Sequence, residues 1–362
     1  MKVFHCDHCD HLVFFESVRC VKCERPLAYL PDQGVTGSLD PGEDGVWHSP
    51  LARAKGRSYK LCQNYTDHNI CNWAVAAEDS EPFCVSCRFT RVIPNLSTPG
   101  NKEAWFKLEV AKRRLFYSLL SLKLPLVSKA ESETGLAFEF LDDADSKDGQ
   151  PVLTGHDDGL ITMNIAEADD AERERRRHQL HELYRTLLGH FRHEIGHYYW
   201  DKLIKDGPHL DRYRELFGDE REDYAQALER HYQNGTPPNW QDRFISAYAT
   251  AHPWEDWAET WTHYLHMTDT LETASDCGIS MNPKRANEPE LKLGAELPES
   301  EQSAFLAMID RWHALTYVLN NLNRGMGLAD GYPFVISAPA IEKLRFVHEI
   351  VVMQSATQNS HN

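Results

Sequence analysis

The spacing of hydrophobic residues in this 362-residue chain predicts a small sheet followed by several helices. Apolar residues recur at helical spacing from Glu103 to Leu122. Residues 136–141 and 159–165 instead show the short apolar runs of two β-strands. Residues 171–204 contain no proline and follow Asp169-Asp170, whose charges suit a helix N-terminus, so we expect one long helix there.

The helical pattern returns several times in the second half of the chain. It covers a region that ends at His231 and the ranges 254–266, 303–322 and 337–352. Residues 281–303 are polar and contain Pro and Glu, which indicates a loop. Residues 355–362 are polar and terminal, so we expect a disordered tail. The pattern predicts an α+β chain whose larger part is mostly helical.

Eight of the nine cysteines lie in the first quarter of the chain, and the first four form two C-x-x-C pairs. These are Cys6-x2-Cys9 and Cys20-x2-Cys23, with ten residues between the pairs. Two such pairs across a short hairpin are typical of a closed tetrahedral zinc site with a structural role. Redox-active pairs are the weaker alternative, because no βαβ pattern surrounds them. We therefore expect a zinc ribbon over residues 1–30.

A second group of four cysteines follows a segment rich in Pro, Gly, Asp and Ser. We interpret residues 31–58 as a linker and residues 59–95 as a second zinc-binding module. Its expected ligands are Cys62, Cys71, Cys84 and Cys87. The pattern is weaker than the first, because only the last two cysteines form a C-x-x-C pair. Two alternatives stay open: His68 replaces one ligand, or Cys62 or Cys71 is an ordinary buried thiol.

Charge and composition narrow the possible partners and the compartment. The formal net charge is -17 and no basic patch stands out, which disfavours non-specific nucleic-acid binding. No apolar run approaches the ~18 residues of a membrane span, and Met1 to Cys9 do not resemble a secretory signal. We expect a soluble, cytoplasmic protein with reduced cysteines, no membrane contact, and a peptide or protein as substrate. The zinc ribbon is a possible site for a protein partner.

The motif His193-Glu194-x-x-His197 carries the candidate chemistry. In a helix, residues four apart project from one face, so both imidazoles can reach one zinc ion. The glutamate can then act as a base on the attacking water. The alternative is a solvated helix that carries two histidines by chance. The flanking residues are too apolar for that: Leu187, Leu188, Phe191, Ile195, Tyr198, Tyr199 and Trp200.

A second acidic pair lies downstream, in the predicted helix 254–266. Glu255 and Glu259 are four residues apart and share a face among several tryptophans. Two buried carboxylates repel each other unless each has a cationic partner. If one binds the metal and the other orients a ligand imidazole, both are explained. Glu259 itself and His263 are the alternatives for the third metal ligand.

The sequence resembles the zincins with a glutamate ligand. More closely, it resembles a bacterial family of metallopeptidases with an N-terminal zinc ribbon and a zincin-like domain. The resemblance rests on the four ribbon cysteines, residues 184–200 and residues 252–261. It implies a zincin-like catalytic domain over residues 100–354, with a small sheet whose edge can bind an extended peptide.

The resemblance also assigns roles to residues of the downstream segment. It implies that Glu255 binds zinc and that Glu259 hydrogen-bonds a ligand histidine. Tyr248, seven residues before Glu255, occupies the place of a tyrosine that donates to the developing oxyanion. Trp254 departs from the pattern, because many such enzymes have Asn there.

The function expected from these residues is zinc-dependent hydrolysis of peptide bonds, with one catalytic zinc ion and one or two structural ones. Glu194 would take the proton from the attacking water and deliver it to the leaving amine. One alternative is an amidase or deamidase that acts on a modified peptide or small amide. Another is a non-catalytic protein in which zinc sites form a scaffold for peptide binding. The intact Glu194 weighs against that second alternative.

Overall fold

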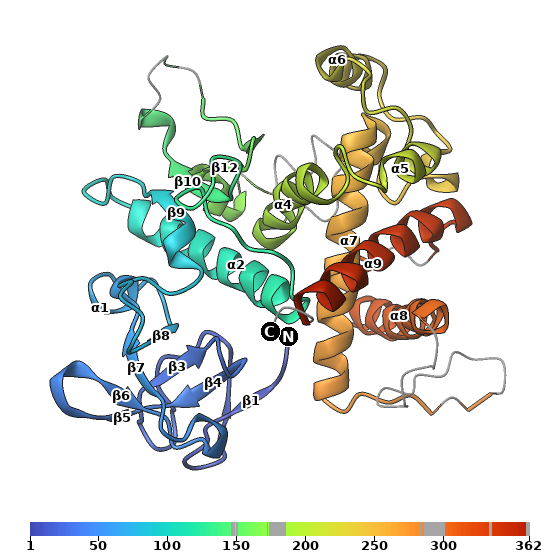
Figure 1. The fold of residues 1–362 in the computed structure, drawn as a ribbon. Coiled ribbons are helices and arrows are strands. Elements are labelled where there is room, and N and C mark those ends of the chain that lie inside the picture. Colours follow the sequence, from blue (N-terminus) through green and yellow to red (C-terminus); the bar gives the residue numbers. More distant parts are fainter. Residues whose placement is uncertain are drawn as a thin grey trace. The chain divides into compact units, whose positions relative to one another are not determined.

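A computed structural model describes residues 1–145, 149, 151–171, 173, 186–282, 284–285, 301–332 and 335–359. The chain divides into two compact units. Of the described residues, 2–173 and 186–198 belong to the N-terminal unit, whereas Met1 and those from 199 onward belong to the C-terminal unit. The boundary falls within helix α4 (Leu187–Leu203), and each unit is described by itself (Figure 1).

Residues 4–76 of the N-terminal unit form three short antiparallel sheets. Strand β1 (Phe4–His5) pairs with β2 (Leu12–Val13), and β3 (Leu27–Leu30) pairs with β4 (Val35–Ser38). A third sheet has the order β5 (Asp40–Pro41), β6 (Trp47–His48), β7 (Ser58–Leu61) and β8 (Ala74–Ala76). The four-residue helix α1 (Gln63–Thr66) follows β7.

Residues 31–58, which the composition predicts to be a linker, are part of these sheets. They contribute β4, β5 and β6, and Leu39 between β4 and β5 is only 1% exposed. The glycines and prolines serve the turns of the hairpins: Gly34 closes the β3–β4 turn with a φ of +63°. A Gly-, Pro- and Asp-rich segment can therefore be a set of tight turns between short strands, and the linker interpretation is wrong.

A mixed sheet and a long helix form the second part of this unit. Helix α2 (Asn101–Ser121) confirms the helix expected from Glu103 to Leu122. The sheet has the order β11 (Gly155–Asp157), β12 (Leu160–Asn164), β10 (Ala137–Leu141) and β9 (Thr90–Val92). Strands β10 and β12 confirm the two expected strands and run parallel, whereas β11 is antiparallel to β12 and lies at the edge.

Aromatic packing fixes α2 and the first half of α4 against this sheet. The ring of Phe138 on β10 lies 6.0 Å from that of Phe116 on α2 and 5.8 Å from that of Phe191 on α4. All three side chains are fully buried. Each such burial contributes about 1.5–3 kcal/mol, so the motif-bearing turns of α4 are held firmly on the sheet. The single long helix expected over residues 171–204 is wrong, because Thr186 is not helical and α4 begins after it. The Gly189 N–H donates to Oγ1 of Thr186 at 2.9 Å, as at a helix N-terminus. Residues 172 and 174–185 lie outside the described ones.

The cysteine-rich sheets pack on α2 within the same unit. The ring of Tyr117 on α2 lies 5.6 Å from that of Phe15 and 6.0 Å from that of Tyr29. Arg114, three residues earlier, forms a 2.6 Å ion pair with Glu16. Strand β9 begins three residues after Cys87 and joins the mixed sheet. The zinc-ribbon region and the sheet are thus parts of one compact unit.

The C-terminal unit is helical in its described residues. It contains α5 (Leu210–Phe217), α6 (Tyr224–Asn234), α7 (Pro253–Asp276), α8 (Glu301–Gly325) and α9 (Ala338–Asn359). Helix α7 contacts α5, α8 and α9, and its buried Trp257 packs on Phe217 of α5 and Phe346 of α9. The region expected to be helical up to His231 is two helices, because Gly218 at a φ of +109° ends α5.

Two further expectations concern the end of the chain. Helix α9 continues to Asn359, so the tail expected to be disordered from residue 355 is helical at least that far. Residues 353–359 contain neither glycine nor proline, and the helix that begins at Ala338 can therefore extend through them. Residues 360–362 and most of the expected loop 281–303 lie outside the described residues.

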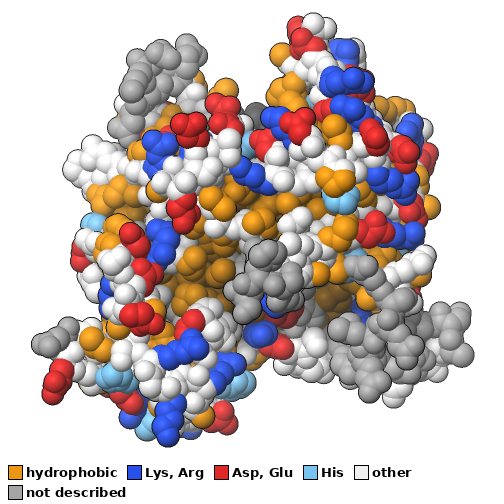
Figure 2. Space-filling model, viewed as in Figure 1, with side chains coloured by type: hydrophobic (Ala, Val, Ile, Leu, Met, Phe, Trp, Pro, Cys, Tyr) orange, Lys and Arg blue, Asp and Glu red, His pale blue; other side chains and the backbone are white. Residues whose placement is uncertain are grey.

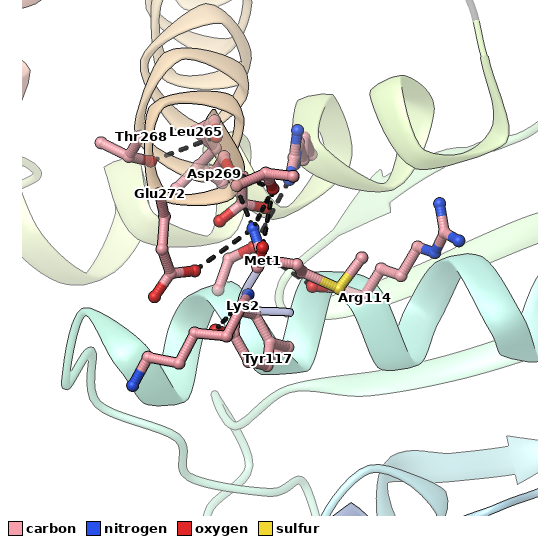
Figure 3. Close-up of polar contacts among 11 residues, drawn as sticks. Met1, Lys2, Arg114, Tyr117, Leu265, Thr268, Asp269 and Glu272 are labelled. Carbon is pink, nitrogen blue, oxygen red and sulfur yellow. Dashed lines mark hydrogen bonds and ion pairs between the residues drawn. The ribbon is translucent and has the colours of Figure 1, made fainter. Parts of the chain in front are cut away.

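The α-amino group of Met1 contacts the last turns of α7 within the C-terminal unit (Figure 3). It donates to the carbonyl oxygen of Asp269 at 2.8 Å and to Oγ1 of Thr273 at 2.7 Å. It also lies 3.2 Å from a carboxylate oxygen of Glu272. A positive charge near the C-terminal end of a helix is favoured by the helix dipole.

Charged side chains of both signs are interspersed on the face shown in Figure 2. Among the described helices, none combines the length and the apolar character that crossing a membrane requires.

Candidate metal centres and catalytic site

The first four cysteines come together around one point. Sγ of Cys6 lies 3.7 Å from Sγ of Cys23, and Sγ of Cys9 lies 3.6 Å from that of Cys20. Zn–S bonds of about 2.3 Å in a tetrahedron place sulfur atoms roughly 3.8 Å apart, so these distances fit a zinc ion. They are far too long for a disulfide bond.

The backbone explains how each C-x-x-C pair presents its sulfurs. In both, the residue after the second cysteine has a positive φ: Asp10 at 57° and Glu24 at 60°. Its N–H donates to the carbonyl oxygen of the first cysteine, at 2.7 Å to Cys6 and 2.9 Å to Cys20. The two pairs therefore form equivalent tight turns that aim four thiols at one centre.

The second group of cysteines also converges. The Sγ atoms of Cys62, Cys71, Cys84 and Cys87 lie within 4.8 Å of one another, and all four residues are buried. Backbone N–H groups point at three of the sulfurs, such as the Cys84 N–H, 3.3 Å from Sγ of Cys62. Such donors stabilise thiolates, the form that binds zinc. His68, the alternative ligand, packs its ring against Trp105 at 5.5 Å.

Helix α4 places His193 and His197 one turn apart in the N-terminal unit. Their Nε2 atoms are 3.2 Å apart, and their rings meet nearly at right angles. Zn–N bonds of about 2.05 Å in a tetrahedron give an N–N distance of roughly 3.3 Å. Two imidazole nitrogens of one helix face thus fit two ligands of a single zinc ion.

Glu194, between the two histidines, is held by a side chain that the sequence analysis did not single out. Its Oε1 lies 3.1 Å from Nε2 of His190, and Nδ1 of the same ring lies 2.7 Å from Oε2 of Glu167. Burial acts to raise the pKa of Glu194, but the hydrogen bond and charge of His190, with the charges of His193 and His197, lower it overall. The carboxylate is therefore kept ionised, as a general base requires.

His156 on the edge strand β11 is a second residue that the sequence analysis missed. Its ring lies nearly parallel to that of His197, with 6.2 Å between the centroids. The Gly159 N–H donates to its Nε2 at 2.8 Å, so the neutral ring carries its hydrogen on Nδ1. Burial lowers the pKa of His156 to about 4, which keeps the ring neutral near pH 7. The contact brings the edge strand beside a candidate metal ligand.

In the C-terminal unit, the start of α7 fixes the orientation of Glu255. His252 is the N-cap and accepts a 3.1 Å hydrogen bond from the Trp254 N–H on its Nδ1, while Pro253 occupies the first turn. The carboxylate of Glu255 is 1% exposed, and the hydroxyl of Tyr224 donates to its Oε1 at 2.6 Å. The tyrosine was not foreseen, because it lies 31 residues earlier, on α6.

The other predicted residues also belong to the C-terminal unit. Glu259 is half-buried on α7, one turn after Glu255. The buried His263, an alternative ligand, engages its Nδ1 with the Tyr332 hydroxyl, and burial lowers its pKa to about 4. Tyr248 is half-buried, and its ring lies 5.9 Å from that of His231.

A cavity of about 480 Å³ opens near Tyr224 within the C-terminal unit. Aromatic walls come from Trp200, Tyr224 and Trp254, and charged residues such as Arg214 and Glu220 complete the lining. Arg214 and Glu220 are paired with each other through a 2.9 Å bond from Nε to Oε2. The cavity thus combines aromatic and charged lining residues.

Comparison with known proteins gives two family matches and several relatives. A family model described as "Putative zinc-binding metallo-peptidase" matches residues 101–350, and a zinc-ribbon domain model matches residues 3–98. That second match spans both groups of cysteines.

Uncharacterized proteins of Mycobacterium tuberculosis and Mycobacterium bovis are 42% identical to this chain over 353 residues. The aligned region covers 97% of this chain and 95% of theirs. No solved structure matches the chain. Because the first model covers well over half of it, the chain belongs to this family of zinc-binding metallopeptidases with an N-terminal zinc ribbon.

Proposed function

We propose that the protein is a zinc-dependent metallopeptidase in which His193, His197 and Glu255 hold the catalytic zinc ion. The observation that carries this proposal is the arrangement on α4. Two imidazole nitrogens lie at the distance of two zinc ligands, and a buried, ionised Glu194 lies on the same helix turn. Two histidines and a carboxylate form a three-ligand set that leaves one position open for catalysis.

Glu255 is preferred as the third ligand for reasons within its own unit. Its buried carboxylate is oriented through Oε1 by Tyr224, as metal-binding carboxylates are by outer hydrogen bonds. The ring of the rival His263 already contacts Tyr332. Glu259 lies on the same face of α7 and would orient one ligand histidine.

Zinc, when bound, polarises the scissile carbonyl and lowers the pKa of the attacking water. The remaining steps belong to the chain's own residues. Glu194 accepts a proton from water on its carboxylate and delivers it to the leaving amine, a contribution of about 10²–10⁴-fold in rate. Tyr248 would donate a hydrogen bond to the oxyanion that develops on the carbonyl.

The substrate class follows from the sheet. Strand β11 is an edge strand, and the contact between His156 and His197 lies along it. An extended peptide that pairs with a free edge forms backbone hydrogen bonds whatever its sequence. We therefore expect the scissile bond of a peptide to pass beside the two histidines of α4.

The test compares zinc-loaded wild type with Glu194→Gln, using a diverse peptide pool read by mass spectrometry. The substitution keeps the shape of the side chain and removes the base, so only the wild type should cleave, while both bind equal zinc. Equal cleavage by both proteins would refute the role of Glu194. No cleavage by either, with zinc bound, would instead favour a narrow amidase or a peptide-binding protein.

A further inference from the structure

We infer that His190 is a positioning residue that holds the general base Glu194 in its working orientation, and that Glu167 in turn fixes His190. The inference rests on the proposed function, because it concerns the same base. It stands on two distances: 3.1 Å from Nε2 of His190 to Oε1 of Glu194, and 2.7 Å from Nδ1 to Oε2 of Glu167. A single imidazole thus bridges two carboxylates with both of its nitrogens.

The bridge is anchored in the sheet. Asn164, the last residue of β12, caps the short helix at Ile165–Ala168 by accepting a 2.9 Å bond from the Ala166 N–H. The Asn164 side chain also donates to the Val152 carbonyl at 2.9 Å, and it is fully buried. Glu167 lies in that short helix, so the sheet, and not α4, fixes the position of its carboxylate.

His190 and Glu194 lie one turn apart on α4, whose Phe191 packs on the same sheet. Of the three members, Glu167 is 1%, His190 8% and Glu194 5% exposed. Buried hydrogen bonds of this kind are strong and restrict the groups that they join. The bridge therefore ties the base on the helix to the sheet that carries the edge strand.

The contact with His190 gives the two oxygens of the Glu194 carboxylate different roles. With Oε1 engaged by His190, the other oxygen is the one left to face water and substrate. An unrestrained glutamate has three rotatable bonds, and misplacing a catalytic group by about 1 Å can cost 10²-fold in rate. Loss of the bond from His190 should therefore lower kcat and leave KM and zinc binding nearly unchanged.

Two substitutions separate this role from simple packing. In His190→Gln the new amide nitrogen falls near the place of Nε2 and can still donate to Glu194. In His190→Asn the amide nitrogen falls near Nδ1 and can reach only Glu167. We expect His190→Gln to keep kcat within about 3-fold and His190→Asn to lower it about 10–100-fold, at equal zinc content. If the two variants lose kcat equally, in step with their melting temperatures, His190 is only a packing residue and the inference fails.

A structural readout makes the inference independent of any substrate. Crystal structures of zinc-loaded wild type, His190→Gln and His190→Asn should show the Glu194 carboxylate in one place in the first two and displaced in the third. An unmoved carboxylate in His190→Asn would overturn the inference, even if the protein proves to be a peptidase. A displaced carboxylate would support it, even if no peptide is cleaved and the proposed function fails.

Discussion

At the scale of single residues, the hydroxyl of Tyr224 donates a hydrogen bond to the carboxylate of Glu255. Tyr224→Phe removes this hydroxyl and preserves the ring that packs on His252 and Trp254. Because outer hydrogen bonds to a metal ligand typically contribute 10–100-fold in affinity, we expect about that loss of zinc affinity at one site. Competition with a colorimetric chelator measures it.

The control for this change lies on the same helix. Tyr232→Phe also deletes one hydroxyl from α6, at a side chain that is mostly solvent-exposed, and should leave zinc affinity unchanged. Equal affinity of Tyr224→Phe and wild type would argue against Glu255 as a ligand. That result would favour Glu259 or His263 as the third zinc ligand.

Residue-level prediction from the sequence succeeds where spacing along one element decides the geometry. His193 and His197 come together because helical periodicity alone aligns residues four apart. His190 has the same spacing to Glu194, so its contact was within reach of that rule. Glu167 and Tyr224 were not, because folding brings them to their partners from 23 and 31 residues away.

At the scale of elements, β9 connects the second group of cysteines to the mixed sheet. It begins three residues after Cys87 and pairs with β10, the strand on which α4 packs through Phe138. Cys87→Ser removes one thiolate of a buried site whose metal organises the backbone around it. We expect faster amide hydrogen exchange in β9 and in the part of β10 that pairs with it.

Cys277→Ser provides the matched control, because Cys277 is exposed and follows α7 in the other unit. Its exchange pattern should equal that of the wild type. If Cys87→Ser also leaves β9 and β10 unchanged, the second cysteine site is not a structural support of the sheet.

The sequence predicts long helices more readily than short strands. Helices of more than twenty residues, such as α2, carry several turns of periodic pattern, and so the pattern identifies them. Strands of two or three residues, such as β6, β9 and β11, are too short to show alternation. Their pairing depends on partners elsewhere in the chain, which is why composition alone suggests a linker over residues 31–58.

At the scale of the whole molecule, the donor sets predict three zinc ions per chain with different accessibility. In the second cysteine site all four ligands are buried, whereas Cys9 and Cys23 of the first are half-buried. A catalytic ion must keep a position open to solvent and substrate. A bidentate chelator such as 1,10-phenanthroline should therefore remove the catalytic ion first, then the ion of the first site, and last that of the second.

Native mass spectrometry during chelation measures this order, and circular dichroism follows the fold. We expect three ions at the start. The first ion should be lost with the helical signal intact, because α4 packs on the sheet through Phe191 without help from the metal.

The double variant His193→Ala/His197→Ala should begin with two ions and show only the two slower losses. Structural zinc contributes roughly 10–16 kcal/mol to the folding of small zinc modules, so the last loss should coincide with unfolding of the cysteine-rich sheets. A first loss that already abolishes the helical signal, or three ions in the double variant, would show that the histidines of α4 do not form the most accessible site.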